Sequence, residues 1–347
     1  MTKAMQTDGT PEGNVLAADP ALAIVIIGRN EGERLRKSIT SSLRSSHAAV
    51  YVDSGSTDGS VELAKSLGVE VVELDSSTPF TAARGRNTGF NYLNEKNFTF
   101  QFVQFVDGDD EMDKAWFRAG LDTLMENHDV GIVAGRKKEC FPDKSVYNTL
   151  FDMEWDTAIG EVDEVSGTFM ARADLFEQLG GFNETLIAGE DPELCFRVRQ
   201  AGWKILRLAD FMAWHDANMM QFAEWWRRAV RTGHAYAEGA VLHGKSTQRH
   251  NLKQTRSNWA WGLILPIIVV VLAVPTTGLS LLLLPSYLVL FYRVYKWRKS
   301  LGNSDRHAIL YAGFTVLGKV PCAWGQILYW KNRWQGKVST LIEYKAI

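Results

Sequence analysis

Cysteines are few, and the N-terminus has no apolar segment. Cys140, Cys195 and Cys322 lie far apart, with no C-x-x-C spacing, which argues against a disulfide framework and against a zinc site. Residues 1–20 lack the apolar run that a secretory signal or an anchor requires. We therefore expect a flexible polar leader over residues 1–20.

Acidic residues are scarce at the C-terminal end of the chain. Residues 249–347 hold 13 Lys and Arg but two Asp and Glu, whereas the preceding residues hold 25 Lys and Arg and 38 Asp and Glu. The net charge of −2 over 347 residues hides this division. Hydrophobic residues make up 46% of the chain, enough for a substantial core. We expect two differently built regions, residues 21–245 and residues 246–347.

The first region alternates short β-branched runs with helical patterns, which is typical of βαβ units and a largely parallel sheet. The sequence predicts an α/β fold. The expected strands are 22–27, 50–52, 69–74, 100–106 and 130–134, and the expected helices include 31–44, 60–67 and 82–94.

The most informative stretch is residues 102–113, where an apolar strand ends in five carboxylates within seven residues. Such crowding is unfavourable unless a cation compensates for it, and ligands usually bind at the ends of strands in α/β sheets. Asp107 and Asp109 supply hard oxygen ligands on a tight turn, which suits Mg²⁺ or Mn²⁺. A solvated acidic turn is the alternative.

Three further segments carry polar groups where a ligand could bind. Asp53 follows the second strand, where a base and ribose would lie in a doubly wound sheet, and Asp58 in the same loop alternatively caps the next helix. Arg84 and Arg86 begin a helix and could neutralise a diphosphate, or could be surface-exposed. Residues 190–193 form an acidic turn in which a carboxylate could act as a general base, or could complement the helix dipole.

The second region contains two apolar runs, residues 259–274 and 279–292, with basic residues on both flanks. Each run is shorter than the roughly 20 residues of a spanning helix, so we expect a hairpin over about 259–292 that is short, tilted or re-entrant, or two full spans. The flanking charges place both ends on the cytoplasmic side. A buried hairpin of a soluble domain is the alternative.

Residues 306–335 mix apolar and aromatic side chains with cations. This pattern indicates interfacial helices, with rings at headgroup depth and cations towards anionic lipid. An amphipathic helix packed on the first region would show the same pattern.

Five motifs occur in a characteristic order: VDSGSTDGS at 52–60, ARGRNTG at 83–89, VDGDD at 106–110, VSGTFMARADLFEQLGGF at 165–182 and GEDPELCFRVRQAGW at 189–203. Together they resemble the family 2 glycosyltransferases of the GT-A fold, a Rossmann-like nucleotide-sugar domain, over roughly residues 22–243. The chain departs from many relatives in having Asp53-Ser54 where they carry paired aspartates, which leaves the donor base open.

The resemblance implies a role for each candidate residue. Donor binding falls to Asp53 at the nucleobase and to Arg84, Arg86 and Asp107 around the diphosphate. Asp107 and Asp109 would bind the metal. His215 would face the phosphates or the metal, or would have a structural role instead. Asp191 is the expected catalytic base, with Glu190 beside it as the other candidate. Arg228 and Arg231 would close over the diphosphate, or would meet lipid phosphates instead.

The sequence therefore predicts a metal-dependent inverting glycosyltransferase of the cell membrane, with its catalytic domain on the cytoplasmic side. Mg²⁺ or Mn²⁺ is the expected cofactor. The expected partners are a nucleotide-sugar donor, a lipid-linked or glycan acceptor and membrane lipids, but no nucleic acid. A nucleotidyltransferase that makes an activated sugar and a catalytically silent membrane scaffold are the alternatives.

Overall fold

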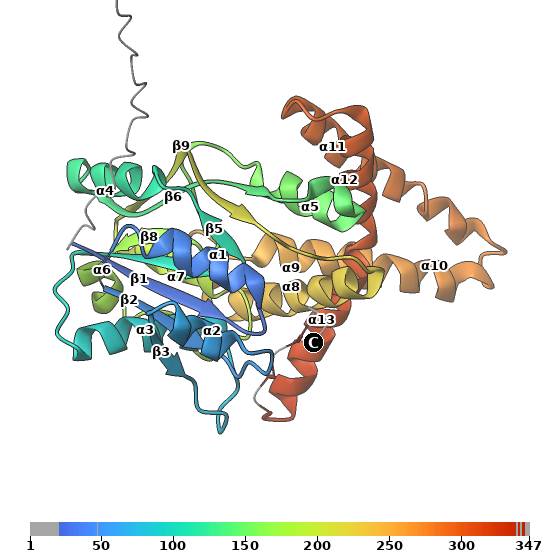
Figure 1. Cartoon of the computed structure of the whole chain (residues 1–347). Coiled ribbons are helices and arrows are strands. Elements are labelled where there is room, and N and C mark those ends of the chain that lie inside the picture. The colour runs from blue at the N-terminus through green and yellow to red at the C-terminus, as the bar shows by residue number, and fades with distance from the viewer. Residues whose placement is uncertain (1–20, 47, 338, 341, 344–347) are drawn as a thin grey trace, which may run out of the picture.

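The computed structural model describes residues 21–46, 48–337, 339–340 and 342–343 (Figure 1). The leader expected at residues 1–20 lies outside these ranges. The described chain forms an α/β domain with a helical C-terminal region that projects from one side of it.

A nine-stranded sheet forms the core of the domain, in the order β3-β2-β1-β4-β8-β6-β9-β5, with β7 on β9. Its first half is parallel, as expected, and its central strand β1 is almost entirely buried. These strands are β1 (Leu22–Gly28), β2 (Ala48–Asp53), β3 (Glu70–Glu73) and β4 (Phe102–Asp107).

The second half of the sheet is mixed, which corrects the expectation of a largely parallel sheet. β8 (Phe169–Arg172) lies antiparallel between β4 and β6 (Val130–Glu139), and β9 (Lys204–His215) runs parallel to β6. Short strands β5 (Asp110–Met112) and β7 (Gly160–Glu161) pair antiparallel with β9. A strand buried on both faces is an apolar run in either direction, so its pattern does not show its orientation.

Helices flank the sheet (Figure 1). Close packing is visible at Gly89, where an added Cβ would lie 2.4 Å from Val25 Cγ1 of β1. The predicted helices 31–44, 60–67 and 82–94 are confirmed as α1, α2 and α3. The helices of the domain are α1 (Glu33–Ser42), α2 (Ser60–Ser66), α3 (Ala82–Glu95), α4 (Trp116–Glu126), α5 (Val146–Trp155), α6 (Ala173–Gln178), α7 (Glu190–Gln200) and α8 (Phe222–His243).

The C-terminal region contains three helices that are long and apolar enough to cross a membrane: Leu252–Ala273, Leu279–Ser300 and Asp305–Trp334. The first two have 22 residues each, more than the apolar runs alone suggested, because polar residues extend the first helix at its N-terminal end and the second at its C-terminal end. The segments are α9 (Leu252–Trp259), a π-helical turn, α10 (Leu265–Ala273), a 3-10 turn, α11 (Ser286–Ser300), α12 (Asp305–Leu317) and α13 (Lys319–Trp334).

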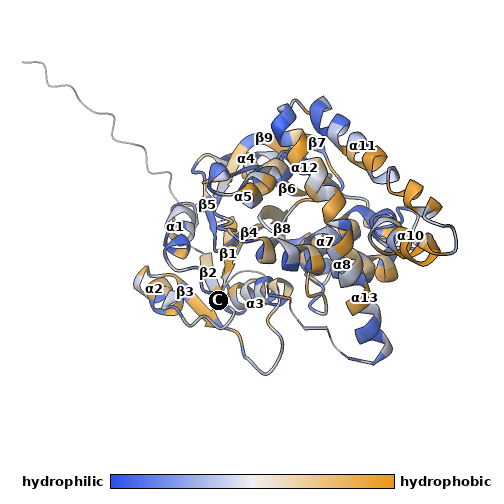
Figure 2. Cartoon of the chain, turned by 90° about the vertical axis from the view of Figure 1, so that its right-hand side faces the viewer, coloured by the Kyte–Doolittle hydropathy of each residue, from blue (hydrophilic) through white to orange (hydrophobic). Residues whose placement is uncertain are grey.

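The hairpin from α9 to α11 projects into solvent at its tip (Figure 1). Val270, Val274 and Leu282 are 72%, 86% and 72% exposed, and this part of the chain is coloured as strongly apolar in Figure 2. Exposed apolar surface of this extent marks an interaction site rather than a buried core. The alternative of a buried hairpin is therefore not what the structure shows.

Helix α13 packs directly on α8 of the catalytic domain. Added Cβ atoms at Gly325 and Gly233 would lie 1.9 Å from Val230 O and 2.0 Å from Cys322 O, so small residues let the two backbones touch. The segment expected as interfacial helices at 306–335 forms α12 and α13, and the packing of α13 on α8 agrees with the alternative of an amphipathic helix packed on the domain; the interfacial placement stays a prediction.

Candidate functional site

A cleft of about 360 Å³ opens where β1 and β4 end. This is the edge at which α/β sheets commonly bind ligands. Of the candidate residues, Arg86, Asp107, Asp109, Glu190, Asp191, His215, Arg228 and Arg231 line it.

Arg86 of α3 lies at the centre of the site and is 3% exposed. Its Nη2 donates to Asp107 Oδ1 at 2.8 Å, and its Nη1 donates to Glu190 Oε1 at 2.9 Å and to Asp191 Oδ1 at 3.1 Å. Burial alone would lower the pKa of Arg86, but Asp191, Asp107 and Glu190 raise it. One guanidinium therefore joins the acidic turn after β4 to the acidic start of α7.

This arrangement depends on Gly167, in the loop before β8. An added Cβ there would lie 2.0 Å from Arg86 Nη2 and 3.1 Å from Asp107 Oδ2. A side chain at this position would collide with a guanidinium that three carboxylates hold in place, so the VSGTF motif has to carry glycine here.

The acidic start of α7 serves the site and the helix together. Glu190 and Asp191 occupy the first turn, where they complement the helix dipole, and both also reach Arg86. Burial raises the pKa of the Asp191 carboxyl to about 8, with Arg86 opposing the shift and Glu190 adding to it. Such a carboxyl is suited to accept a proton near neutral pH.

A second group lies on the other side of the cleft. Ligand atoms of Asp109, Asp110 and His215 lie within 4.8 Å of one another, and all three residues are buried. His215 Nε2 is 3.5 Å from Asp109 Oδ2, while its Nδ1 contacts Glu139. Burial lowers the pKa of His215, but Asp109 and Glu139 more than reverse this and raise it to about 10.

These residues fit a divalent cation. Asp110 Oδ2 accepts from Lys137 Nζ at 2.7 Å and contacts Thr168, but its buried Oδ1 has no hydrogen-bond partner among the described residues. A carboxylate oxygen left in this way is a candidate ligand. Carboxylate oxygens together with an imidazole held by a second carboxylate form a suitable ligand set for Mn²⁺ or Mg²⁺.

Two expected donor-binding residues, Asp53 and Arg84, do not line this cleft. Asp53 is buried below the loop and accepts hydrogen bonds from Tyr51 Oη, Gly55 N and Ser56 N at 2.8, 2.9 and 2.7 Å. Its carboxylate organises the turn and does not line the cleft. Asp58 accepts from Ser60 N at 3.0 Å at the start of α2, which supports the capping alternative for that residue.

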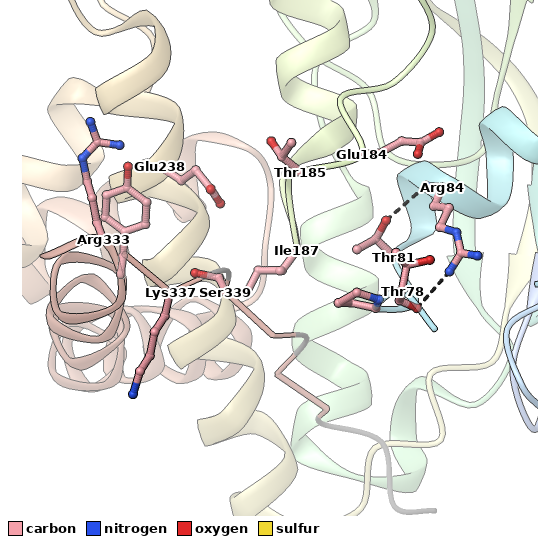
Figure 3. A pocket seen from close by; sticks show the side chains of 12 residues that line it. Thr78, Thr81, Arg84, Glu184, Thr185, Ile187, Glu238, Arg333, Lys337 and Ser339 are labelled. Carbon is pink, nitrogen blue, oxygen red and sulfur yellow. Dashed lines mark hydrogen bonds between the residues drawn. The ribbon is translucent and has the colours of Figure 1, made fainter. Parts of the chain in front are cut away.

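Arg84 lines a separate pocket (Figure 3), and its Nη1 donates to Thr78 O at 2.9 Å. This corrects the expectation that Arg84 and Arg86 act together. Residues two positions apart on a helix point in nearly opposite directions, so one arginine enters the cleft and the other faces away from it.

Sequence patterns alone did not single out Asp110, Lys137 and Glu139 as site residues. Lys137 and Glu139 continue the buried face of β6 beyond its apolar run, two residues apart, and are 5% and 2% exposed. The register of β6 and β9 pairs Glu139 with His215. Residues 136–139 are all charged, so the sequence shows no polar and apolar alternation that would mark Lys137 and Glu139 as buried. The alternation in burial appears only once β6 is paired in the sheet.

Comparisons with known proteins agree with this geometry. Residues 23–180 match the family model of glycosyl transferase family 2. The chain is 26% identical over 246 residues to the glycosyltransferase AglE of Haloferax volcanii, a match that covers 66% of this chain and 77% of that protein.

A pre-mycofactocin glycosyltransferase of Mycobacterium tuberculosis is 26% identical over 240 residues, covering 65% of this chain. The match spans about half, 49%, of that relative. Among solved structures, the mannosyltransferase PcManGT from Pyrobaculum calidifontis, in complex with GDP-Man and Mn²⁺, has a TM-score of 0.56 at 18% identity. That alignment covers 86% of this chain and 89% of the other.

These matches favour a glycosyltransferase over the nucleotidyltransferase and scaffold alternatives. Motif order, sheet topology and the family match together identify residues 23–180 as a glycosyl transferase family 2 domain, in a sheet that agrees with the GT-A fold.

Proposed function

We propose that this glycosyltransferase is metal-dependent and inverting, and that it moves a sugar from a nucleotide-sugar donor to a hydroxyl of a lipid-linked or membrane-surface glycan. The observation that carries this proposal is the Arg86 bridge, which holds Asp107 of the acidic turn and Asp191 of α7 around one guanidinium. The structural neighbour with bound GDP-Man and Mn²⁺ supports a donor and a metal of this kind.

Asp109 and His215, with Asp110 or Asp107, would hold the cation. A divalent ion bound there supplies positive charge that stabilises a departing diphosphate. Arg228 and Arg231 of α8 border the same cleft and add cationic charge towards the phosphates.

Asp191 would take the proton of the acceptor hydroxyl as that oxygen attacks the anomeric carbon. The carbon–oxygen bond to the diphosphate breaks as the new glycosidic bond forms, so a single displacement inverts the configuration. Arg86 fixes the Asp191 carboxylate in position, and Glu190 shares the same guanidinium nitrogen.

The membrane part of the proposal rests on the hairpin. The first arm contacts α13 at Gly262, where an added Cβ would lie 2.0 Å from Lys319 O, and it leaves α13 beyond that residue. The second arm returns to the domain at Arg298, whose Nη2 donates to Met153 O at 3.1 Å. Residues 264–274 reach about 16 Å at 1.5 Å per residue, about half of the bilayer core. This favours a re-entrant hairpin over two full spans.

Both ends of such a hairpin share one side of the membrane with the catalytic domain. The basic flanking residues make that side the cytoplasmic one. The helix α12–α13 would lie at the interface, with α12 next to α5 and α13 held on α8 of the same domain.

The metal assignment is tested by Asp109→Asn in the full-length chain. Losing a ligand from a cleft should leave the fold intact and abolish transfer, whereas Glu111→Gln, in the same acidic run but half-exposed and paired with Lys37 at 3.6 Å, should keep activity. Hydrolysis of a panel of nucleotide sugars with Mn²⁺ would be measured. Full turnover of Asp109→Asn, or of the unaltered protein in EDTA, would refute the assignment.

A further inference from the structure

Two smaller cavities continue the catalytic cleft towards the hairpin. The inner cavity, about 250 Å³, includes Gly189 and Pro192 beside the expected base and shares Arg228 and Arg231 with the cleft. The interhelical cavity, about 190 Å³, lies among α5, α8, α9, α12 and α13. It shares Thr232 and Tyr236 with the inner cavity, and Arg228 borders all three spaces.

The interhelical cavity contains a polar site among buried groups. Asn258 of α9 lines it and is 2% exposed. Its Oδ1 accepts from Lys319 Nζ at 3.2 Å, but its Nδ2 has no hydrogen-bond partner in the described part of the chain. An unpaired buried donor destabilises the protein, and an acceptor atom of a ligand would remove that cost.

The charge of this site favours an anion. Lys319 and Arg228 both line the cavity, against the single carboxylate of Glu154, which accepts from Arg228 Nη2 at 2.8 Å. An ammonium, a guanidinium and an amide N–H from three different helices face one small space. A phosphate, with several oxygens and negative charge, matches this set of donors.

The surroundings indicate what the phosphate is attached to. Trp225, Tyr311 and Phe314 supply aromatic walls, and Asn258 lies at the base of the exposed apolar hairpin. Aromatic rings and cations at the root of an inserting segment occupy headgroup depth. The phosphate of a lipid could therefore enter here while its chain stays along the hairpin.

We propose that the interhelical cavity binds the phosphate of a lipid-linked acceptor, whose saccharide extends past Arg228 through the inner cavity to Asp191. This inference rests on the proposed function, because it names the acceptor class of the same site. It assigns Lys319 and Asn258 to acceptor binding.

The test is equilibrium binding of a short-chain prenyl phosphate to the detergent-solubilised full chain, with the matching prenol and inorganic phosphate as separate probes. Prenyl phosphate should bind about tenfold or more tightly than prenol, because charge-assisted contacts are worth roughly 1.5–3 kcal/mol. Prenol binding as tightly as prenyl phosphate would overturn the phosphate site. Inorganic phosphate binding as tightly as prenyl phosphate would show a free-phosphate site and overturn the lipid assignment.

Two variants locate the site. Lys319→Gln should weaken prenyl phosphate binding by about tenfold, and the nearly isosteric Asn258→Asp should also weaken it by placing a carboxylate beside the anion. Lys296→Gln, on the exposed face of α11, is the control and should bind as the unaltered chain does. If both site variants, still folded by thermal unfolding, bind as Lys296→Gln does, the assignment is wrong.

Binding to Asp191→Asn separates this inference from the proposed function. The variant should retain prenyl phosphate binding, because Asp191 does not line the interhelical cavity. In the unaltered chain, prenyl phosphate binding together with no sugar transfer to any acceptor would remove the proposed function and leave the phosphate site standing. Sugar transfer to a glycan without any prenyl phosphate binding would leave the proposed function standing and remove the phosphate site.

Discussion

Arg86 determines how the carboxylates of the site are arranged. It is buried and contacts three acids at 2.8–3.1 Å, so each acid is held and partly neutralised without a ligand. A buried arginine bound in this way positions other groups rather than meeting the donor phosphates directly. We propose that Arg228 and Arg231, which border the cleft from α8, contact the donor phosphates instead.

The roles of the two acids on α7 can be separated by substitution. Asp191→Asn should keep donor and metal binding but lower transfer by on the order of 10² to 10⁴, because a general base is needed only when the acceptor reacts. Glu190→Gln should retain more activity, since Glu190 is 6% exposed and paired with Arg86. Single-turnover rates with saturating donor check this, and the opposite pattern would make Glu190 the base.

Gly167→Ala tests the close approach to Arg86. The added methyl would lie 2.0 Å from Arg86 Nη2, so we expect a loss of about 1–3 kcal/mol in the free energy of unfolding, together with loss of transfer. Gly313→Ala, where nothing lies within 4 Å of the added Cβ, is the control and should be neutral or slightly stabilising. Equal unfolding midpoints for the two variants would contradict the contact.

At the scale of elements, the hairpin differs from the rest of the molecule. Ser280 Oγ donates to Val269 O at 2.8 Å and Tyr287 Oη to Trp261 O at 2.5 Å, so its two arms are joined to each other. Its apolar side chains face outward, which is costly in water and favourable in lipid. We therefore expect the hairpin to insert into a membrane as one unit.

Leu282→Arg should weaken insertion without affecting the catalytic domain. Leu282 is 72% exposed at the tip, and an arginine at apolar depth costs about 2.5–3.5 kcal/mol. Flotation with anionic liposomes in about 1 M salt, where the Debye length is about 3 Å, removes purely electrostatic binding. The unaltered chain and Leu282→Ala should float, and Leu282→Arg should not; flotation of all three would argue against insertion at this tip.

At the scale of the whole molecule, the catalytic domain and the C-terminal helices share one interface. Val230 and Ala237 on α8 are 5% and 1% exposed beneath this region. Removing residues 249–347 would therefore expose part of the domain's own packing as well as remove the membrane segment. Replacing the hairpin tip alone should detach the enzyme from the membrane without disturbing this packing.

Glu238 on α8 reports on this interface through pH. Burial raises the pKa of its carboxyl from 4.5 to about 7, with Arg333 of α13 opposing, so the folded state binds the proton more tightly than the unfolded state. Stability should therefore fall as pH rises from about 4.5 through about 7. His234, whose Nδ1 is 3.5 Å from Glu238, has its pKa lowered by burial to about 4 and stays neutral over most of this range.

Glu238→Gln should remove the loss of folding stability that occurs as the pH rises. Its unfolding midpoint should exceed that of the unaltered chain by more at pH 8 than at pH 5, as measured by thermal unfolding in detergent. Glu177→Gln, an exposed glutamate of α6, is the matched control and should not reproduce this trend. A constant difference for Glu238→Gln across the range would mean that the carboxyl is not buried at the interface.

The sequence by itself determined the family, the alternation of strands and helices, and most residues that reach the cleft. Strand ends, glycine turns and acidic motifs are local patterns, so Asp107, Asp109, Asp191 and His215 could be identified without coordinates. The charge division and the apolar runs likewise predicted an appended membrane region.

Tertiary structure decided which of these groups meet. The partners of Arg86 lie 21, 104 and 105 residues away along the chain, and their convergence depends on the order of β4 and β8 in the sheet. Lys137 and Glu139 became part of the site because β6 pairs with β9. Such pairings join segments that are distant in sequence, and local periodicity reports only which face of a segment is buried, not what covers it.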